Sequence, residues 1–172
     1  MSKLKLIFLA IPLSFIFNVN VNAQSTGMLE EVVVTAQKRE ESLQDTPIAI
    51  TAITESTIDD LDIANVVDLA GMAPNVHIIN TPSNNTAATI AMRGGTTINP
   101  AITWEPTVAM YLDGVYLGKS QGSIFDVVDL ERVEILRGPQ GTLYGRNTLG
   151  GAINLISKKP SGAGTSTKVT FG

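Results

Sequence analysis

Short apolar runs, separated by turn-forming residues, recur along the chain. Apolar and small residues alternate over positions 47–54, and β-prone runs follow at 76–79, 89–92, 107–112 and 115–117. Ser56 and Thr57 each precede an aspartate by three residues, which predicts the start of a short helix, and Asn65 predicts the N-cap of a second. This pattern predicts an α+β fold, with a small mixed β-sheet and short helices.

The segments between these runs are predicted to be turns and loops. Residues 80–87 and 96–106 are polar and read as long loops, while Asp113-Gly114 predicts a type I′ hairpin turn between two strands. Ser123, three residues before Asp126, predicts one more short helix.

The most distinctive stretch is 131–160, in which two β-prone runs, 133–136 and 152–156, flank a connection punctuated by glycines. A phosphate-binding P-loop would require Lys and Ser or Thr after the second glycine, whereas Gly145 is followed by Arg146 and Asn147. The stretch therefore predicts a defined backbone path and not a phosphate site.

The residues of this stretch resemble the plug domain of TonB-dependent outer-membrane receptors. The resemblance rests on RVEILRGPQG at 132–141, LYG at 143–145 and NTLGGAIN at 147–154, and Arg93-Gly94 and YLDGVY at 111–116 match plug motifs in the same order. It covers roughly residues 30–160 and implies a plug inside a transmembrane β-barrel. A barrel needs several hundred further residues, so we expect this sequence to be a fragment of a receptor.

The N-terminal residues read as a secretory signal peptide. Lys3 and Lys5 precede an apolar block of about a dozen residues, which is too short to span a membrane, and a small-residue site ends at Ala23. We therefore divide the chain into a signal peptide (1–23), a flexible N-terminal segment with a TonB-box-like strand (24–45), the plug (46–160), and a linker with the start of the first barrel strand (161–172).

Segment 31–36 carries the highest β-propensity in the chain. One interpretation is an edge strand of the domain. The other is a strand offered to another protein by β-augmentation, and the resemblance to the TonB box, in composition and in position, implies contact with TonB. The predicted TonB-interacting residues are Glu31, Val32, Val33, Val34, Thr35 and Ala36.

Two further sets of side chains are candidates for contact. Asn84, Asn85 and Trp104 lie in the predicted loops and could touch a ligand, although Trp104 could equally pack against a barrel wall. Three arginines stand beside glycines in an acidic chain and could contact the barrel; the alternative is pairing with Glu131 or Glu134. These arginines are Arg93, Arg137 and Arg146.

Composition limits the remaining chemistry. The 172 residues suffice for about one domain, with a net charge of −4, no cysteine and a single histidine, His77. No polybasic run points to nucleic acid. The acidic cluster at 59–62 departs from the EF-hand pattern and reads as a solvated helix face. We expect no metal and no cofactor.

The resemblance implies ligand-gated import of a scarce nutrient, such as an iron-siderophore complex, across a Gram-negative outer membrane, energised by TonB. The implied partners are TonB, the chain's own C-terminal β-barrel and a small molecule such as an iron chelate; cobalamin and glycans stay open as ligands. No enzymatic activity is expected. The alternative is a free-standing periplasmic binding or interaction domain. A secreted hydrolase lacks support, because a Ser-His-Asp arrangement would rest wholly on the single histidine, His77.

Overall fold

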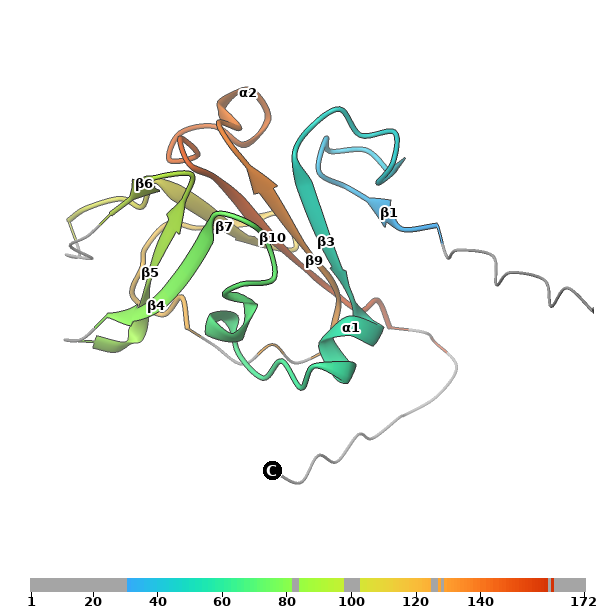
Figure 1. Ribbon diagram of the computed structural model, residues 1–172, viewed down its shortest axis with the longest axis horizontal. Helices are drawn as coiled ribbons and strands as arrows, with labels where there is room; N and C mark the ends of the chain where they lie inside the picture. Colours follow the sequence, from blue (N-terminus) through green and yellow to red (C-terminus); the bar gives the residue numbers. More distant parts are fainter. Residues whose placement is uncertain are drawn as a thin grey trace, which may run out of the picture. The chain divides into compact units, whose positions relative to one another are not determined.

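A five-stranded mixed sheet organises the chain (Figure 1). The computed structural model describes residues 31–81, 84–97, 103–124, 127, 129–160 and 162. The strands lie in the order β3-β9-β10-β7-β8. Their bounds are β3 (Ile50–Thr54), β7 (Val108–Leu112), β8 (Val115–Leu117), β9 (Leu130–Arg137) and β10 (Gly151–Ser157). The β10–β7 pair is parallel and the other pairs are antiparallel.

Side chains along each strand point alternately to the two faces of this sheet, and other parts of the chain cover both faces. On β9, Val133 and Ile135 belong to the larger core cluster, with helix, β4 and β5 residues. Leu136 points to the opposite face, where it packs with a smaller cluster that includes Val34 and Ala36. We call this opposite face the second face. Strands that are buried on both faces need apolar residues at nearly every position. This explains the near-continuous apolar runs of β7, β9 and β10.

A second sheet joins β4 (Val76–Thr81), β5 (Asn84–Met92) and β6 (Gly95–Thr96) in antiparallel order. The prediction of a long polar loop over 80–87 was wrong, because β4 and β5 continue through most of it as a hairpin. Ala87 and Ala88 are buried there, and Ala88 donates its N–H to Ser123 Oγ at 3.0 Å. Tertiary packing thus outweighs the polar local sequence.

Two short helical elements follow β3. Helix α1 (Glu55–Asp60) is capped by Thr54, whose hydroxyl accepts from the Thr57 N–H, so the cap lies earlier than the Ser56 or Thr57 predicted. The 3₁₀ turn η1 (Val66–Leu69) has the predicted Asn65 cap, and Asp68 completes a capping box. The helix predicted after Ser123 falls partly outside the described residues.

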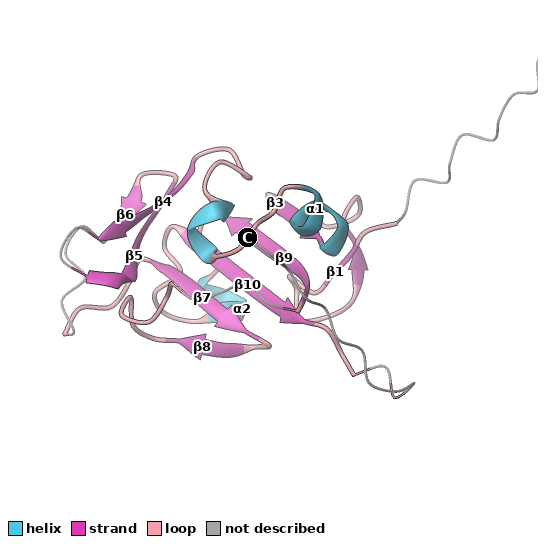
Figure 2. Ribbon diagram, turned by 90° about the horizontal axis from the view of Figure 1, so that it is seen from below, coloured by secondary structure: helices cyan, strands magenta, loops and turns pink. Residues whose placement is uncertain are grey.

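The predicted hairpin at Asp113-Gly114 is confirmed. The two residues have φ of 48° and 81°, as a type I′ turn requires, and they join antiparallel β7 and β8 (Figure 2). Between β9 and β10 lies the one-turn helix α2 (Gly141–Tyr144). No helix in the described part of the chain is both long and apolar enough to cross a membrane.

Candidate functional site

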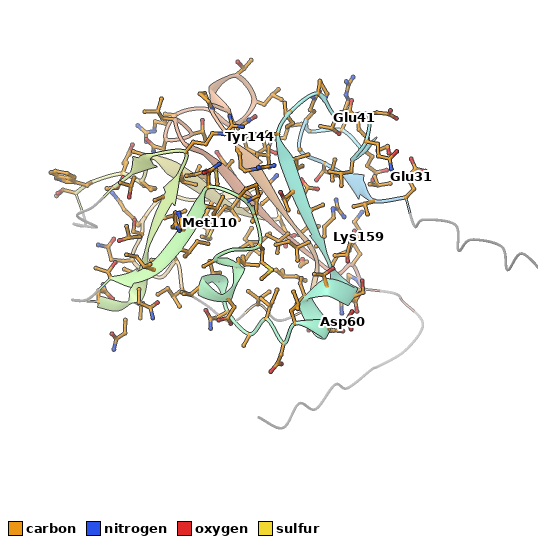
Figure 3. All side chains as sticks on the ribbon, in the orientation of Figure 1. Glu31, Glu41, Asp60, Met110, Tyr144 and Lys159 are labelled. Atoms are coloured by element: carbon orange, nitrogen blue, oxygen red, sulfur yellow. The ribbon has the colours of Figure 1, made fainter. Side chains whose placement is uncertain are left out.

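Segment 31–36 lies docked against the second face of the main sheet. Val33 and Val34 form β1 (Val33–Val34), which pairs antiparallel with β2 (Glu41–Ser42), and Figure 3 shows Glu31 and Glu41 on the same side of the molecule. Val34 and Ala36 are buried, whereas Val33 is 41% exposed. The segment therefore lies as a short edge strand with alternate side chains facing the sheet. Its contact with TonB stays a prediction.

A buried carboxylate holds the backbone at the end of this segment. Glu134, fully buried on β9, accepts a hydrogen bond from the Thr35 N–H at 2.6 Å and one from the Thr35 hydroxyl at 3.2 Å. Arg132 Nε donates to the same carboxylate oxygen at 3.0 Å, and Asn154 Nδ2 reaches the other at 3.4 Å. Because the charge of Glu134 is balanced by Arg132, its burial is tolerated.

A second anchor is Tyr144 at the end of α2. Its hydroxyl donates to the carbonyl oxygen of Ala36 at 2.8 Å and accepts from Asn154 Nδ2 at 2.6 Å. Desolvation raises the pKa of Tyr144 above its ordinary value, and the charge of Glu134 adds to that rise. The phenol therefore stays protonated and available as a donor at physiological pH.

The three tyrosines of the chain meet beside this anchor. Tyr111 packs against Tyr116 and Tyr144, with ring centroids 5.4 and 5.2 Å apart, and its hydroxyl donates to the Tyr144 carbonyl at 2.5 Å. The ammonium of Lys38 lies 4.3 Å from the Tyr144 ring centroid and 5.3 Å from that of Tyr111. The turn that follows segment 31–36 is thus held by a cation–π contact.

The three candidate arginines have different surroundings. Arg146 forms an ion pair with Glu105 at 3.2 Å and is largely exposed. Among the described residues, no acid pairs with Arg93 or Arg137; Nε of Arg137 is buried and lacks a hydrogen-bond partner. Their predicted alternative partners, Glu131 and Glu134, are both paired with Arg132 instead.

Arg93 lies beside the segment that follows Arg137. Gly138 comes directly after Arg137, and a Cβ added at Gly138 would come within 2.7 Å of Arg93 Nη1. Arg93 itself adopts φ of 50° in the turn after β5. Because neither guanidinium pairs with an acid among the described residues, both are suited to an acidic partner.

The candidate ligand-contact residues lie on two different segments, with Asn84 and Asn85 on β5 and Trp104 before β7. Trp104 is 57% exposed, and its neighbour Glu105 is fixed by Arg146 and by Asn147 Nδ2 at 2.8 Å. Asn84 Oδ1 accepts from the N–H and the hydroxyl of Thr86 at 2.9 and 2.8 Å, so it is engaged locally on β5. Nothing in the structure assigns a ligand to them.

The described residues hold no cluster of three or more acidic or histidine side chains arranged to bind a metal. His77 lies on β4 with an exposed side chain, paired across the hairpin with Ala91.

The fold and these motifs define a class of small mixed-sheet domains. The family model of the TonB-dependent Receptor Plug Domain matches residues 42–152. The pesticin receptor of Yersinia pestis is 33% identical over 141 residues, which are 81% of this chain and 20% of that protein. The catecholate siderophore receptor Fiu of Escherichia coli is 35% identical over 120 residues, which are 67% of this chain and 14% of that protein. The vitamin B12 transporter BtuB of Vibrio vulnificus is 27% identical, and the match covers 80% of this chain and 22% of that protein.

Solved structures agree with this assignment. The ferric yersiniabactin uptake receptor FyuA from Yersinia pestis matches with a TM-score of 0.59 at 33% identity, over 66% of this chain and 17% of that one. The pyoverdine receptor FpvA from Pseudomonas aeruginosa matches with a TM-score of 0.60 at 25% identity. The match covers 75% of this chain and 18% of that one.

The chain belongs to the TonB-dependent receptor plug domain family. The predicted resemblance and the predicted α+β fold are both confirmed. The chain spans about a fifth of the length of the pesticin receptor, and the relatives named here are receptors and a transporter, not enzymes.

Sequence reasoning missed the residues that hold segment 31–36. Glu134, Tyr144 and Asn154 were interpreted as parts of a family motif, with no contact assigned between them and residues 35–36. One signal was available: Glu134 stands inside an otherwise apolar run, at a position that alternation places on a buried face.

Proposed function

We propose that this chain is the plug of a ligand-gated receptor in the outer membrane of a Gram-negative cell, which imports a scarce small molecule with energy delivered through TonB. The observation that carries the proposal is the plug-family match over residues 42–152. It is supported by relatives named as siderophore receptors and a vitamin B12 transporter. The remainder of the receptor would form the barrel around this plug.

The ligand class we favour is a ferric siderophore. The names of Fiu, FyuA and FpvA describe receptors for catecholate siderophores, ferric yersiniabactin and pyoverdine, whereas BtuB transports vitamin B12. Uptake of radiolabelled iron presented as a catecholate, a hydroxamate or a mixed chelate, with labelled cobalamin in parallel, separates these classes. Uptake of cobalamin alone would contradict the siderophore assignment.

Segment 31–36 is the part we propose as the contact with TonB. An importer in a membrane without ATP must receive its energy from another part of the cell. A strand bound by a periplasmic partner can transmit that energy as a mechanical force. Main-chain hydrogen bonds give the grip in such β-augmentation, while the side chains need only suit a strand. A β-prone run with one exposed valine, Val33, meets that requirement.

Val33 provides the test, because its exposed side chain can be changed without opening a cavity in the core. Val33→Pro removes one donor and fixes φ, and each lost ladder bond costs on the order of 1 kcal/mol. In the intact receptor we expect Val33→Pro to bind ligand normally and to fail in uptake, with Val33→Thr close to wild type. Uptake by Val33→Pro at the wild-type rate would show that this segment is not the coupling strand.

Arg93 and Arg137 are proposed to face the barrel. Arg93 and Arg137 lack acidic partners among the described residues, so carboxylates of a polar lumen would satisfy them. Arg146 was placed in the same group; its pairing with Glu105 makes it the weakest of the three candidates.

Trp104, with Asn84 and Asn85, is proposed to contact ligand. The exposed indole offers a large amphipathic surface for a ring or an acyl chain. The anchoring of Glu105 by Arg146 and Asn147 restrains the backbone next to it. This would let Trp104 meet a ligand at low cost in conformational entropy.

The domain division is also a proposal. Residues 1–30, and residues 161–172 except Gly162, lie outside the described residues. Export with cleavage after Ala23 is tested by N-terminal sequencing of outer-membrane material, where an intact Met1 would refute it.

A further inference from the structure

The first half of β5 contains a β-bulge. Asn80 of β4 pairs with Ala88, but the next residue of β4, Thr81, pairs with Asn84. Residues 85–87 of β5 therefore have no partner on β4, whereas the pairs up to Asn80–Ala88 keep one register. Bulges redirect side chains and are over-represented beside functional sites, so the bulge at 85–87 is a candidate for such a role.

Another segment binds the bulge in place of β4. Ala87 pairs with Gln121 in an isolated antiparallel bridge, and the Ile124 N–H donates to the Thr86 carbonyl at 3.2 Å. We call residues 120–124, which lie along this part of β5, the strap. Because buried main-chain groups need hydrogen-bond partners, the strap supports the part of β5 that β4 does not.

Ser123 joins the strap to β5 through its side chain. Its hydroxyl accepts from the Ala88 N–H at 3.0 Å and donates to the Ser120 carbonyl at 2.6 Å. Ser123 is 4% exposed, and Ala87 and Ala88 beside it are buried. Since a buried N–H that loses its acceptor is destabilising, the Ser123 hydroxyl fixes the strap and the bulge in one arrangement.

The bulge leaves the side chain of Asn85 exposed to solvent. Asn84 Oδ1 is engaged by the N–H and the hydroxyl of Thr86, whereas no described residue makes a hydrogen bond with the Asn85 side chain. Its amide offers two donors and an acceptor. Such a group is suited to an amide or a hydroxyl group of a ligand.

We propose that Ser123 is a positioning residue for ligand binding: it fixes the bulge on the strap and thereby presents Asn85 to an amide or hydroxyl group of the imported ligand. The inference rests on the proposed function, in which Asn84 and Asn85 contact the ligand. Ser123 is buried and acts through Asn85. A contact that is already in place avoids the entropy cost of ordering the bulge on binding, so loss of the Ser123 hydroxyl weakens binding.

Variants of two serines in the intact receptor test this role. Ser123→Ala removes the hydroxyl, and Ser123→Thr keeps it; Ser123 lines a cavity of about 20 Å³, which leaves space for the added methyl. Ser120→Ala removes a hydroxyl of the same strap that makes no hydrogen bond with a described residue, and so is the matched control. The probe is the labelled ligand that the wild-type receptor binds: iron as a catecholate, hydroxamate or mixed chelate, or cobalamin.

We expect Ser123→Ala to raise the Kd by about threefold to tenfold, as loss of one hydrogen bond implies, and to speed amide hydrogen exchange over residues 84–88. Exchange in β9 and β10 should match wild type. Ser123→Thr should restore the Kd, and Ser120→Ala should leave it unchanged. Asn85→Ala should raise the Kd in the wild-type background but add little to Ser123→Ala, because the contact is already lost there. This non-additivity separates positioning of Asn85 from a general loss of stability.

Other outcomes overturn the proposal in distinguishable ways. A wild-type Kd in Ser123→Ala, or effects of Ser123→Ala and Asn85→Ala that simply add, refutes the positioning role and leaves the proposed function standing. An unchanged Kd in Asn85→Ala refutes the contact of Asn85 with the ligand, and the role of Ser123 with it, while the receptor still imports. A wild-type receptor that binds none of these ligands refutes both the proposed function and the inference.

Discussion

The backbone N–H of Thr35 donates to the buried carboxylate of Glu134 at 2.6 Å, although 99 positions separate the two residues in the chain. A charge-assisted hydrogen bond to a fully desolvated acceptor is among the stronger contacts that a loop can make. It ties the residues that precede the family match at 42–152 to the centre of the plug sheet. Segment 31–36 is therefore part of the folded domain.

Glu134→Ala should destabilise the chain by about 3 kcal/mol, because it removes the buried carboxylate that pairs with Arg132 and leaves the Thr35 N–H without its acceptor. Urea unfolding followed by circular dichroism measures the change. Glu131→Ala removes the more exposed partner of the same arginine, and should cost under about 1 kcal/mol. Equal costs for the two variants would contradict the role given to the buried carboxylate.

Much of the main sheet could be predicted from short β-prone runs. The runs at 47–54, 107–112, 115–117, 133–136 and 152–156 all overlap observed strands, because strands covered on both faces need apolar residues at most positions. The Asp113-Gly114 turn was also predictable, since few residues tolerate two consecutive positive φ angles.

The elements that escaped prediction depend on distant contacts. The strands at 76–79 and 89–92 were predicted and lie within β4 and β5, but their extension into 80–87 was not. That part contains Asn and Thr residues that locally favour a loop, and it pairs because Ala87 and Ala88 are buried. Parallel pairing of β7 with β10 joins residues about 40 apart and leaves no local pattern. The Thr35–Glu134 contact is of the same kind, so it could not be derived from either segment alone.

Gly151 should tolerate no side chain. It adopts φ of 150° at the start of β10, and a Cβ there would overlap the Leu136 carbonyl oxygen and the sulfur of Met92. Gly151→Ala should cost about 3 kcal/mol or more, since backbone as well as core must move. Gly141→Ala is the control: it has open space and helical backbone, so it should be neutral or stabilising by up to about 1 kcal/mol. Equal melting temperatures for the two variants would refute this account.

The contribution of Asp113 to stability should depend on pH. Hydrogen bonds from the hydroxyl and the N–H of Ser157, at 2.6 and 2.9 Å, lower the pKa of Asp113 below its ordinary value. A lowered folded-state pKa adds stability above the unfolded-state pKa of about 3.9, and that stability is lost as pH falls through the folded-state pKa. Asn tolerates the positive φ at this position, so Asp113→Asn isolates the charge.

Urea unfolding of wild type and Asp113→Asn at several pH values measures this effect. The wild-type advantage should be largest above about pH 5 and should shrink below about pH 4. An advantage that is constant from pH 7 to pH 3 would show that the ionised carboxylate contributes nothing to the contact with Ser157.

Trp104→Ala in the intact receptor should weaken ligand binding without unfolding the plug, because its exposed side chain contributes little to the core. Loss of an aromatic contact with a ligand is worth about 0.5–1.5 kcal/mol, or about twofold to tenfold in Kd. Leu149→Ala, which removes another exposed apolar side chain, is the control and should leave the Kd unchanged. An unchanged Kd for Trp104→Ala would assign the indole to packing against the barrel instead.

Arg93 should couple energetically to an acid of the barrel lumen. Its guanidinium lies beside Gly138, has no acidic partner among the described residues, and belongs to a turn fixed by the hydrogen bond from Arg93 N–H to the Asn75 carbonyl at 3.1 Å. A partly desolvated pair with a lumenal carboxylate would show a coupling of about 1 kcal/mol or more in a double-mutant cycle. The cycle is run on the thermal stability of the intact receptor, with Arg93→Ala against Ala substitutions of each lumenal acid.

Arg146 supplies the comparison, because it is exposed and already paired with Glu105. Its coupling to the same acids should be close to zero, since an exposed pair is weak and screened by salt. Raising the salt concentration should leave the Arg93 coupling largely intact if that pair is desolvated. Zero coupling of Arg93 with every lumenal acid would refute its proposed contact with the barrel.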